Sequence, residues 1–377
     1  MKKLFFLTLC ILALGHIIYS QPTGYNFTIK KELFCTPVKN QASTSTCWSF
    51  SGISFLESEL MRIWKKVCDL SEMYIVRLTY EEKAERYARM HGTCAFAGGG
   101  EYHDVINICR EYGLVPEEIY PGLNYGEFSH NHRELDAALK GYMDGVLKNR
   151  TLTTAWPAGL DGILDAYLGQ IPAEFTWEGS MYTPAGFSKA LGINPDEYII
   201  LSSFSHHPFY QPFILDVPDN WSAGTCYNLP LDEFMEVIDN AVMTGYSVAW
   251  ASDVSDKGFS MKEGVAIVPL KGWNEMSEEE AIQVFKGPHP QKVITQELRQ
   301  REYDNYSTTD DHGMHIVGMA VDQEGNTFYK VKNSWGITGK YDGFIFVSSP
   351  YVQLRTTNCM VHKDAIPVKI AKKLGII

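Results

Sequence analysis

Residues 40–51 have the sequence NQASTSTCWSFS, and apolar residues then recur at positions 53, 56, 60, 63 and 67. This spacing predicts a long helix, and the serines and threonines before it are typical N-cap residues. Cys47 is therefore expected in the first helical turn, where the positive end of the helix dipole favours a thiolate. The backbone N–H of Cys47 and the side-chain amide of Gln41 would then form an oxyanion hole. A lone cysteine in such a place is more often a buried, inert core residue, so other residues must decide.

Two later segments carry residues that would activate a cysteine. Residues 310–318 read DDHGMHIVG, and residues 332–336 read KNSWG. A histidine on a strand, His312, can act as general base to the cysteine once its tautomer is fixed. The side-chain oxygen of Asn333 would orient the imidazole, and Trp335 would shield that hydrogen bond from water. Cysteine, histidine and asparagine in this chain order are typical of the papain-like catalytic triad.

On these motifs the chain resembles the papain-like cysteine peptidases, and within them the bleomycin hydrolase and aminopeptidase C branch. The segments around Cys47 and Asn333 are similar to the family's signatures, and His312-Gly313-Met314 resembles the branch's His-Ala-Met. Gly99-Gly100-Glu101-Tyr102 resembles its Gly-Gly-Gln-Trp. The resemblance implies an α+β papain-like fold of two subdomains, one helical and one β-barrel-like, and a peptidase that needs no cofactor. It implies catalytic roles for Cys47, His312, Asn333 and Gln41. It also implies substrate contacts for Gly99, Gly100 and Trp335.

His315 competes with His312 for the role of base. The two lie three residues apart, so in a strand they point to opposite faces. Only His312 matches the position of the branch's histidine, and we interpret His315 as a packed strand residue. The pairs His206/His207 and His130/His132 have no cysteine or carboxylate at a recognisable metal-ligand spacing, so loop histidines and no metal site are predicted.

The domain organisation follows from spacing and composition. His312 lies 265 residues after Cys47, whereas about 130–150 residues separate the two in a minimal papain-like enzyme. Helical patterns at about 80–91 and 102–112 come early, a further one at 231–244, and strand patterns at 247–251, 314–321, 327–332 and 344–348 come late, which indicates α+β. We expect one peptidase domain, 21–377, with a helical subdomain (about 35–124), an insertion (about 125–228) and a strand-rich subdomain (about 229–377).

The first twenty residues are predicted to be a secretory signal peptide. Lys2 and Lys3 precede an apolar run that ends near Ile18, and Ser20 suits a cleavage site. About 15 apolar residues are too few for a membrane anchor, which needs roughly 20. The sequence therefore predicts an exported protein, periplasmic or secreted, with no membrane span after cleavage. Loss of Cys10 would leave seven cysteines, an odd number, so at least one thiol stays unpaired.

The net charge indicates which partners the protein binds, and the C-terminus bears on which peptide bonds it cuts. With 33 basic and 45 acidic residues the net charge is −12, which disfavours nucleic acid and leaves peptides as the expected partners. In the branch, a C-terminal tail occupies the cleft and restricts cleavage to free amino ends. Here the chain ends at Ile377, short of that tail's usual reach, so aminopeptidase action and assembly into a homo-oligomer stay open. The alternatives are an open-cleft endopeptidase, an acyltransferase and a peptide-binding module on an inactive scaffold; the intact set of candidate catalytic residues argues against the last.

Overall fold

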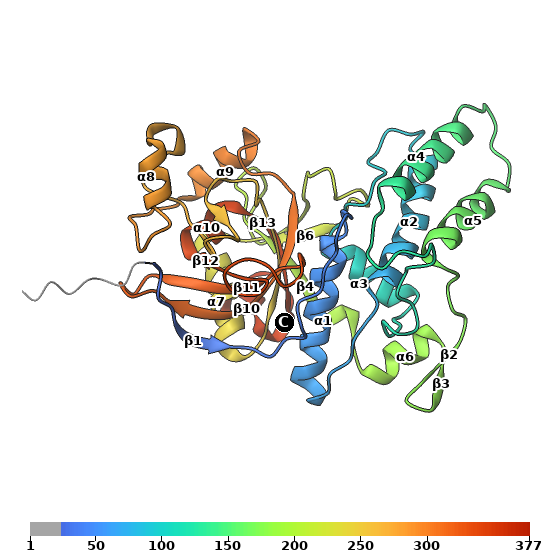
Figure 1. The fold of residues 1–377 in the computed structure, drawn as a ribbon, viewed down its shortest axis with the longest axis horizontal. Coiled ribbons are helices and arrows are strands. Elements are labelled where there is room, and N and C mark those ends of the chain that lie inside the picture. Colours follow the sequence, from blue (N-terminus) through green and yellow to red (C-terminus); the bar gives the residue numbers. More distant parts are fainter. Residues whose placement is uncertain (1–23) are drawn as a thin grey trace, which may run out of the picture.

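The computed structural model describes residues 24–377. The predicted signal peptide, 1–20, lies outside the described residues, so cleavage and export stay predictions. Within residues 24–377, none of the helices has both the length and the apolar content that crossing a bilayer requires. The described chain forms a helical part and a strand-rich part that lie side by side, with the first helix between them (Figure 1).

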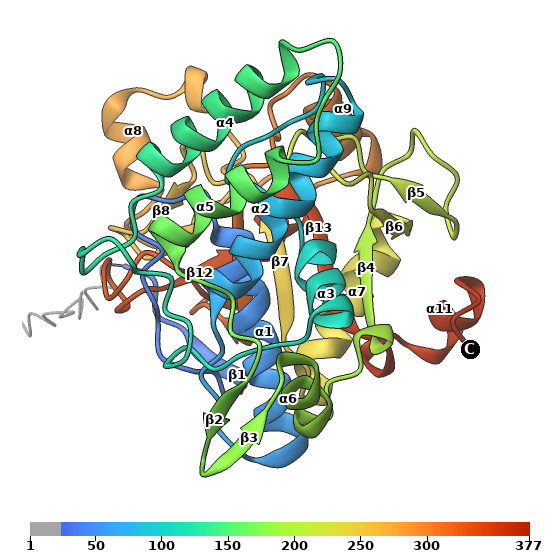
Figure 2. The same cartoon turned by 90° about the vertical axis from the view of Figure 1, so that its right-hand side faces the viewer.

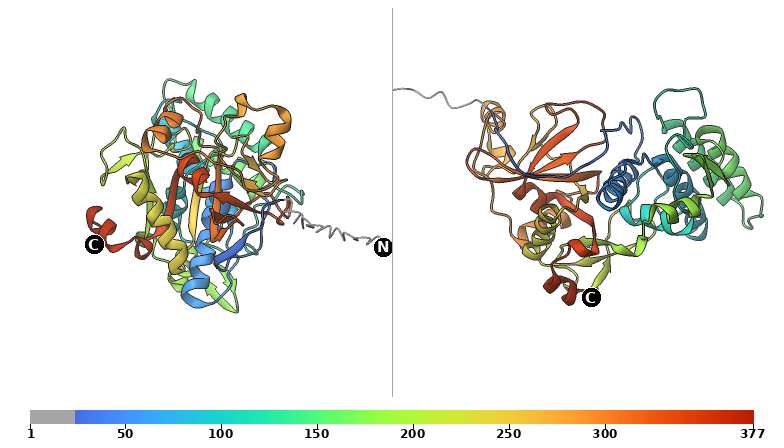
Figure 3. Two further views of the ribbon diagram at one scale, coloured as in Figure 1. Left: turned by 90° about the vertical axis from the view of Figure 1, so that its left-hand side faces the viewer. Right: turned by 90° about the horizontal axis from the view of Figure 1, so that it is seen from below.

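The helical part contains six helices and one short hairpin. The rotated views in Figure 2 and Figure 3 show that α4 and α5 lie on the outside of α2. Its elements are α1 Cys47–Trp64, α2 Glu72–Arg89, α3 Tyr102–Glu111, α4 Arg133–Leu147, α5 Trp156–Leu168, α6 Pro184–Leu191, β2 Phe175–Trp177 and β3 Ser180–Tyr182.

The strand-rich part is built on one eleven-stranded sheet in the order β5-β6-β4-β13-β7-β10-β11-β12-β9-β8, with β1 also pairing to β10. Most neighbouring strands are antiparallel, while β4 with β6 and β12 with β9 are parallel. The strands are β1 Thr28–Glu32, β4 Tyr198–Ser202, β5 Pro212–Ile214, β6 Thr225–Asn228, β7 Val248–Ser252, β8 Phe259–Ser260, β9 Val265–Ala266, β10 His312–Val321, β11 Thr327–Lys332, β12 Phe344–Ser348 and β13 Thr356–His362. The accompanying helices are α7 Leu231–Thr244, α8 Glu278–Gln283, α9 Gln296–Asp304, α10 Ser349–Arg355 and α11 Val368–Lys373, with short 3₁₀ turns at Pro195–Glu197, Trp273–Glu275 and Lys363–Ala365.

Helix α7 shows how local sequence fixes these elements. Its apolar residues recur at helical spacing and are buried in the core of the strand-rich part. The helix ends at Gly245, whose φ of 104° is a left-handed conformation that glycine adopts at low cost. The bounds predicted from sequence, 231–244, agree with the structure.

Each part has its own core, and α1 belongs to the helical one. Trp48, Ile53 and Leu56 of α1 pack with α2 and α3, while the core of the strand-rich part gathers residues of β7, β10, β11 and β13 around α7. The observed α+β architecture is the predicted one.

The predicted insertion, residues 125–228, does not fold as one body. Its first part supplies α4, α5, the β2–β3 hairpin and α6, which join the helical core. Its last part supplies β4, β5 and β6, which extend the sheet beyond β13. The predicted subdomain boundaries thus stay predictions, and this segment contributes to both sides of the molecule.

Candidate active site

Cys47 is the first residue of α1 and is half-buried. The carbonyl of Thr46 accepts the N–H groups of Ser49 and Phe50 at 3.0 and 3.1 Å, which starts the helix without a side-chain cap. The Cys47 sulfur lies within hydrogen-bonding reach of the backbone N–H groups of Gly313 and Trp48. The nucleophile candidate therefore faces the start of β10, where the candidate base is located.

Gly313 permits this close approach of β10 to α1. A Cβ atom added at Gly313 would lie 2.7 Å from Oγ of Ser51 and 3.2 Å from the Cα of Trp48. Any side chain here would push the strand away from the helix. The glycine after His312 thus holds the imidazole's strand against the first turn of α1.

His312 and Asn333 meet because β10 and β11 are antiparallel neighbours. His315 pairs with Lys332 in the register of these strands, which brings the start of β10 beside the residue that follows β11. His312 Nε2 and Asn333 Oδ1 are 2.7 Å apart, and both residues are buried. An amide oxygen only accepts, so the bond places the proton on Nε2 and leaves Nδ1 as the free base.

Trp335 covers this hydrogen bond, as the sequence predicts. Its ring centroid lies 4.7 Å from that of His312, with the ring planes 33° apart. Trp335 itself is 37% exposed, so it forms part of the surface around the imidazole. A large aromatic ring in this place keeps water from competing for the Asn333 oxygen.

Ser334 links Asn333 to Gln41. The Ser334 N–H donates to Asn333 Oδ1 at 2.7 Å, and the Ser334 hydroxyl donates to Gln41 Oε1 at 2.6 Å. Gln41 Nε2 donates to the carbonyl of Thr44 at 2.9 Å, which uses one of its two hydrogens. The second hydrogen is left for an oxyanion. The role of Ser334 was missed in the sequence, although it lies inside the Asn-Ser-Trp-Gly motif.

Burial makes the resting pair neutral. It raises the pKa of the Cys47 thiol to about 12, an effect that the N–H groups of Gly313 and Trp48 oppose. It lowers the pKa of His312 to about 4, against the opposing hydrogen bond to Asn333. Desolvation thus favours the neutral thiol and opposes the helix dipole, which favours a thiolate. Proton transfer from Cys47 to His312 has to accompany the attack on a substrate.

Gly99 and Gly100 lie beside the first turn of α1. A Cβ atom at Gly100 would come within 2.8 Å of the Trp48 ring, so only glycine fits. Lys83 Nζ donates to the carbonyls of Ala97, at 2.8 Å, and of Gly99. Within residues 24–377, the N–H and C=O of Gly100 have no hydrogen-bond partner. They are available to an extended peptide that pairs as an added strand.

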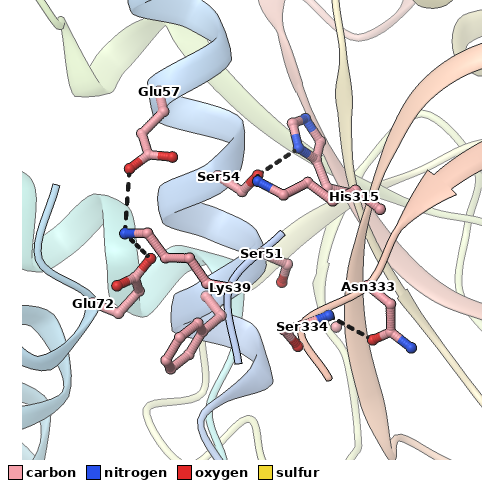
Figure 4. Close-up of a pocket in the computed structure, with 11 residues that line it drawn as sticks. Lys39, Ser51, Ser54, Glu57, Glu72, His315, Asn333 and Ser334 are labelled. Atoms are coloured by element: carbon pink, nitrogen blue, oxygen red, sulfur yellow. Dashed lines mark hydrogen bonds and ion pairs between the residues drawn. The ribbon is translucent and has the colours of Figure 1, made fainter. Parts of the chain in front are cut away.

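His315 is part of a buried polar network with Ser54 and Lys332 (Figure 4). Its Nδ1 is 2.9 Å from the Ser54 hydroxyl, which also accepts from Lys332 at 2.8 Å. Burial lowers the pKa of His315 far below its usual value. The structure thus places His315 as a packed histidine between β10 and α1.

Lys39 completes the same network from the segment before Gln41. Its ammonium lies 2.6 Å from Asp69, 2.8 Å from Glu72 and 3.6 Å from Glu57, between α1 and α2 (Figure 4). The pKa of Glu72 is raised to about 7 by burial, which the lysine opposes. The network fixes the segment that carries Gln41 to both helices.

The other histidine pairs lie outside the site. Burial lowers the pKa of both His130 and His132 to about 4, so they are neutral packing residues. His206 and His207 come close to Asp216, with possible ligand atoms all within 4.8 Å of one another. The sequence did not indicate this carboxylate because nine residues separate it from His207. All seven cysteines in the described part of the chain are free thiols.

Comparisons with known proteins agree with this geometry. Residues 173–375 match the Peptidase C1-like family, and residues 22–151 match the papain family of cysteine proteases. The chain is 20% identical to aminopeptidase C of Streptococcus thermophilus, over 90% of this chain and 83% of the relative. It is 23% identical to the mitochondrial cysteine proteinase 1 of Saccharomyces cerevisiae (strain ATCC 204508 / S288c), over 90% and 77%.

A solved structure shows the same fold. PepW from Lactobacillus rhamnosis HN001 superimposes with a TM-score of 0.74 and 18% identity, over 93% of this chain and 85% of that one. The match of residues 173–375 covers more than half of the 377 residues. The chain is therefore a cysteine-type peptidase and belongs to the Peptidase C1-like family.

Proposed function

We propose that the protein is an aminopeptidase of the aminopeptidase C and bleomycin hydrolase type, with Cys47, His312 and Asn333 as its catalytic triad. The observation that carries the proposal is the 2.7 Å bond from His312 to Asn333, on a strand whose next residue faces the Cys47 sulfur. Relatives named aminopeptidase C support the restriction to amino ends. The predicted signal peptide adds the proposal that the enzyme acts after export.

The chemistry follows from the atoms that face one another. Nδ1 of His312 takes the thiol proton as the Cys47 sulfur attacks the scissile carbonyl, and the resulting imidazolium is held by the Asn333 oxygen. The imidazolium then protonates the leaving amine, and a thioester remains on Cys47. The same nitrogen takes a proton from water, which attacks the thioester and releases the acyl product and the free thiol.

Gln41 would stabilise the charge that develops on the carbonyl oxygen. Its Nε2 has one hydrogen outside the bond to Thr44, and the backbone N–H of Cys47 opens a helix whose first amides lack partners. The Ser334 hydroxyl fixes the amide's orientation through its oxygen. Gln41, Ser334 and Asn333 therefore hold the oxyanion donor and the base in one connected unit.

An open-cleft endopeptidase is the second candidate. The described C-terminus lies at the end of α11, which packs on α7, with Lys373 paired to Glu233 (Figure 2). Both further views show it away from α1 (Figure 3). The described C-terminus therefore lies outside the candidate cleft, which favours the endopeptidase as an alternative.

One experiment separates the candidates. The protein and its Cys47→Ala variant are incubated with one peptide in free and N-acetylated forms, and the products are identified by mass. Stepwise loss of residues from the free form alone supports the aminopeptidase, and internal cuts in both forms support the endopeptidase. Activity retained in Cys47→Ala would reject the triad, and transfer to an added amine in place of water would indicate an acyltransferase.

A further inference from the structure

Three carboxyl groups from separate segments lie beside the proposed catalytic site. They belong to Glu101 at the start of α3, Asp219 in the loop between β5 and β6, and Asp310 just before β10. Asp219 and Asp310 both lie close enough to Cys47 for their charges to raise the pKa of its thiol. They also act on each other, because the charge of Asp219 contributes to raising the pKa of Asp310.

Within residues 24–377 none of these three acids forms an ion pair with a basic side chain. The partner of the Asp310 carboxyl on the site's side is another acid, Glu101. Oε1 of Glu101, on a side chain that is 4% exposed, lies within hydrogen-bonding reach of the Asp310 carboxyl; burial raises the pKa of Glu101 well above its usual value, so these two carboxyls share one proton. Burial raises the pKa of Asp219, and the nearby Lys83 ammonium opposes this through its charge but forms no ion pair with it, since its hydrogens go to the carbonyls of Ala97 and Gly99. Buried carboxyls are stable as anions only when paired, so the cluster is suited to a cation from outside the chain.

The loop that carries Asp219 is fixed in place. Asn220 closes it through bonds to the carbonyls of Leu215 and Gly224, each 2.9 Å long. The buried Trp221 donates its indole N–H to Asp104 on α3 at 2.9 Å. Asp219 is therefore held in place by the two residues that follow it.

The Asp310 segment is equally constrained. The N–H of Thr309 donates to Asp253 at 2.8 Å, and the carboxylate of Asp311 accepts from the N–H of Val254 at 2.8 Å. Both neighbours of Asp310 are thus tied to the end of β7. The Asp310 carboxyl lies within hydrogen-bonding reach of Glu101, whose other oxygen accepts from Asn358 at 2.8 Å.

Asp219 also limits the cleft. A Cβ atom at Gly99 would lie only 2.2 Å from both carboxylate oxygens, so the carboxylate covers this glycine. A peptide that pairs with the backbone of Gly100 would reach the Asp219 carboxylate at the adjacent Gly99. A continuing polypeptide would be blocked there and would leave a carboxylate without a partner, whereas the amino end of a chain would supply a positive charge.

We infer that Asp219 and Asp310 bind the α-ammonium group of the substrate's first residue, and so select free amino ends from within the chain. This inference rests on the proposed peptidase function and names its selectivity element. A metal ion is the weaker occupant, because the ligand atoms of these carboxyls do not gather within 4.8 Å, as those of His206, His207 and Asp216 do among the described residues.

The test compares three variants on matched peptides. Asp219→Asn and Asp310→Asn remove the charge with little change in shape, and Asp216→Asn is the control, since Asp216 is exposed in the same loop. For a peptide with a free amino end, kcat/KM is expected to fall about 10–100-fold in either test variant, the effect of losing a charged hydrogen-bond partner. Most of the change should appear in KM, because the ammonium is bound equally before and during the reaction. The control variant should change kcat/KM less than twofold, and neither test variant should lower any residual turnover of the acetylated peptide.

A second arm identifies the source of the cation and separates this inference from the peptidase proposal. In a Cys47→Ala background, calorimetry should show that Asp219→Asn weakens binding of the free peptide about 10-fold or more and leaves the acetylated peptide unaffected. The inference is overturned if the free-to-acetylated ratio is unchanged in both test variants. It is also overturned if the test variants lower kcat/KM for an acetylated peptide that has a lysine before the cleaved residue, because the carboxylates would then bind a side-chain ammonium. The unmodified enzyme could also bind the free peptide more tightly than the acetylated one and cleave neither. That result would reject the peptidase proposal and keep the ammonium site.

Discussion

Replacement of Asn333 by alanine tests whether the asparagine orients the base. The substitution removes the 2.7 Å bond to His312 and leaves the imidazole Nε2–H without its acceptor in a buried position. An unsatisfied buried donor costs about 1–3 kcal/mol. If that cost falls on the active orientation of the imidazole, kcat/KM decreases about 5- to 150-fold, since 1.36 kcal/mol corresponds to about tenfold in rate.

The assay is kcat/KM on a peptide with a free amino end, with thermal unfolding measured in parallel. Asn107→Ala is the matched control, because Asn107 is exposed on α3, and it should leave kcat/KM within twofold. Asn333→Ala should retain more activity than Cys47→Ala, since the asparagine orients and does not react. A folded Asn333→Ala protein with unchanged kcat/KM would show that the asparagine has no part in positioning His312.

Three other predictions concern the oxyanion donor, the base and the buried network. Gln41→Ala should lower kcat by about 10²–10³ with little change in KM, as expected for a donor used in the transition state; an unchanged kcat would exclude this role. Alkylation of Cys47 by uncharged iodoacetamide, followed by peptide mass mapping, should lose half its rate near pH 4 as pH falls, because burial lowers the pKa of His312 to about 4 and protonation removes the base; a midpoint near 6.5 would contradict it. Lys39→Met leaves buried carboxyls unpaired and should lower the free energy of unfolding by about 3–5 kcal/mol in urea titration, whereas the exposed Lys30→Met should change it by less than about 0.5 kcal/mol.

Local patterns were sufficient to predict the bounds of some elements. The helix at 231–244 and the strands at 327–332 and 344–348 have the predicted bounds. Helix α2 begins at Glu72, eight residues before the predicted start at about 80. Residues 72–80 are all buried, and the polar residues among them do not mark an exposed face. Without alternation between polar and apolar positions, periodicity gives no helix signal there.

The candidate site likewise has residues that the sequence predicts and contacts that it does not. The residues of the triad lie in motifs whose chemistry could be recognised from residue type and order. The position of Asp219 over Gly99 could not, since 120 residues separate them and the contact depends on how β4–β6 extend the sheet. The desolvation of Cys47 could not be predicted for a related reason: Gly313, Asp310 and Asp219, which act on its thiol, are far from it in the sequence.

Trapping of the acyl-enzyme tests the central claim most directly. The enzyme is mixed with an activated ester of an amino acid that has a free amino group, quenched in acid within one turnover, and digested for mass spectrometry. The account predicts one added acyl group on the peptide that contains Cys47, and no adduct in Cys47→Ala. Turnover with an adduct on another residue, or turnover by Cys47→Ala, would contradict it.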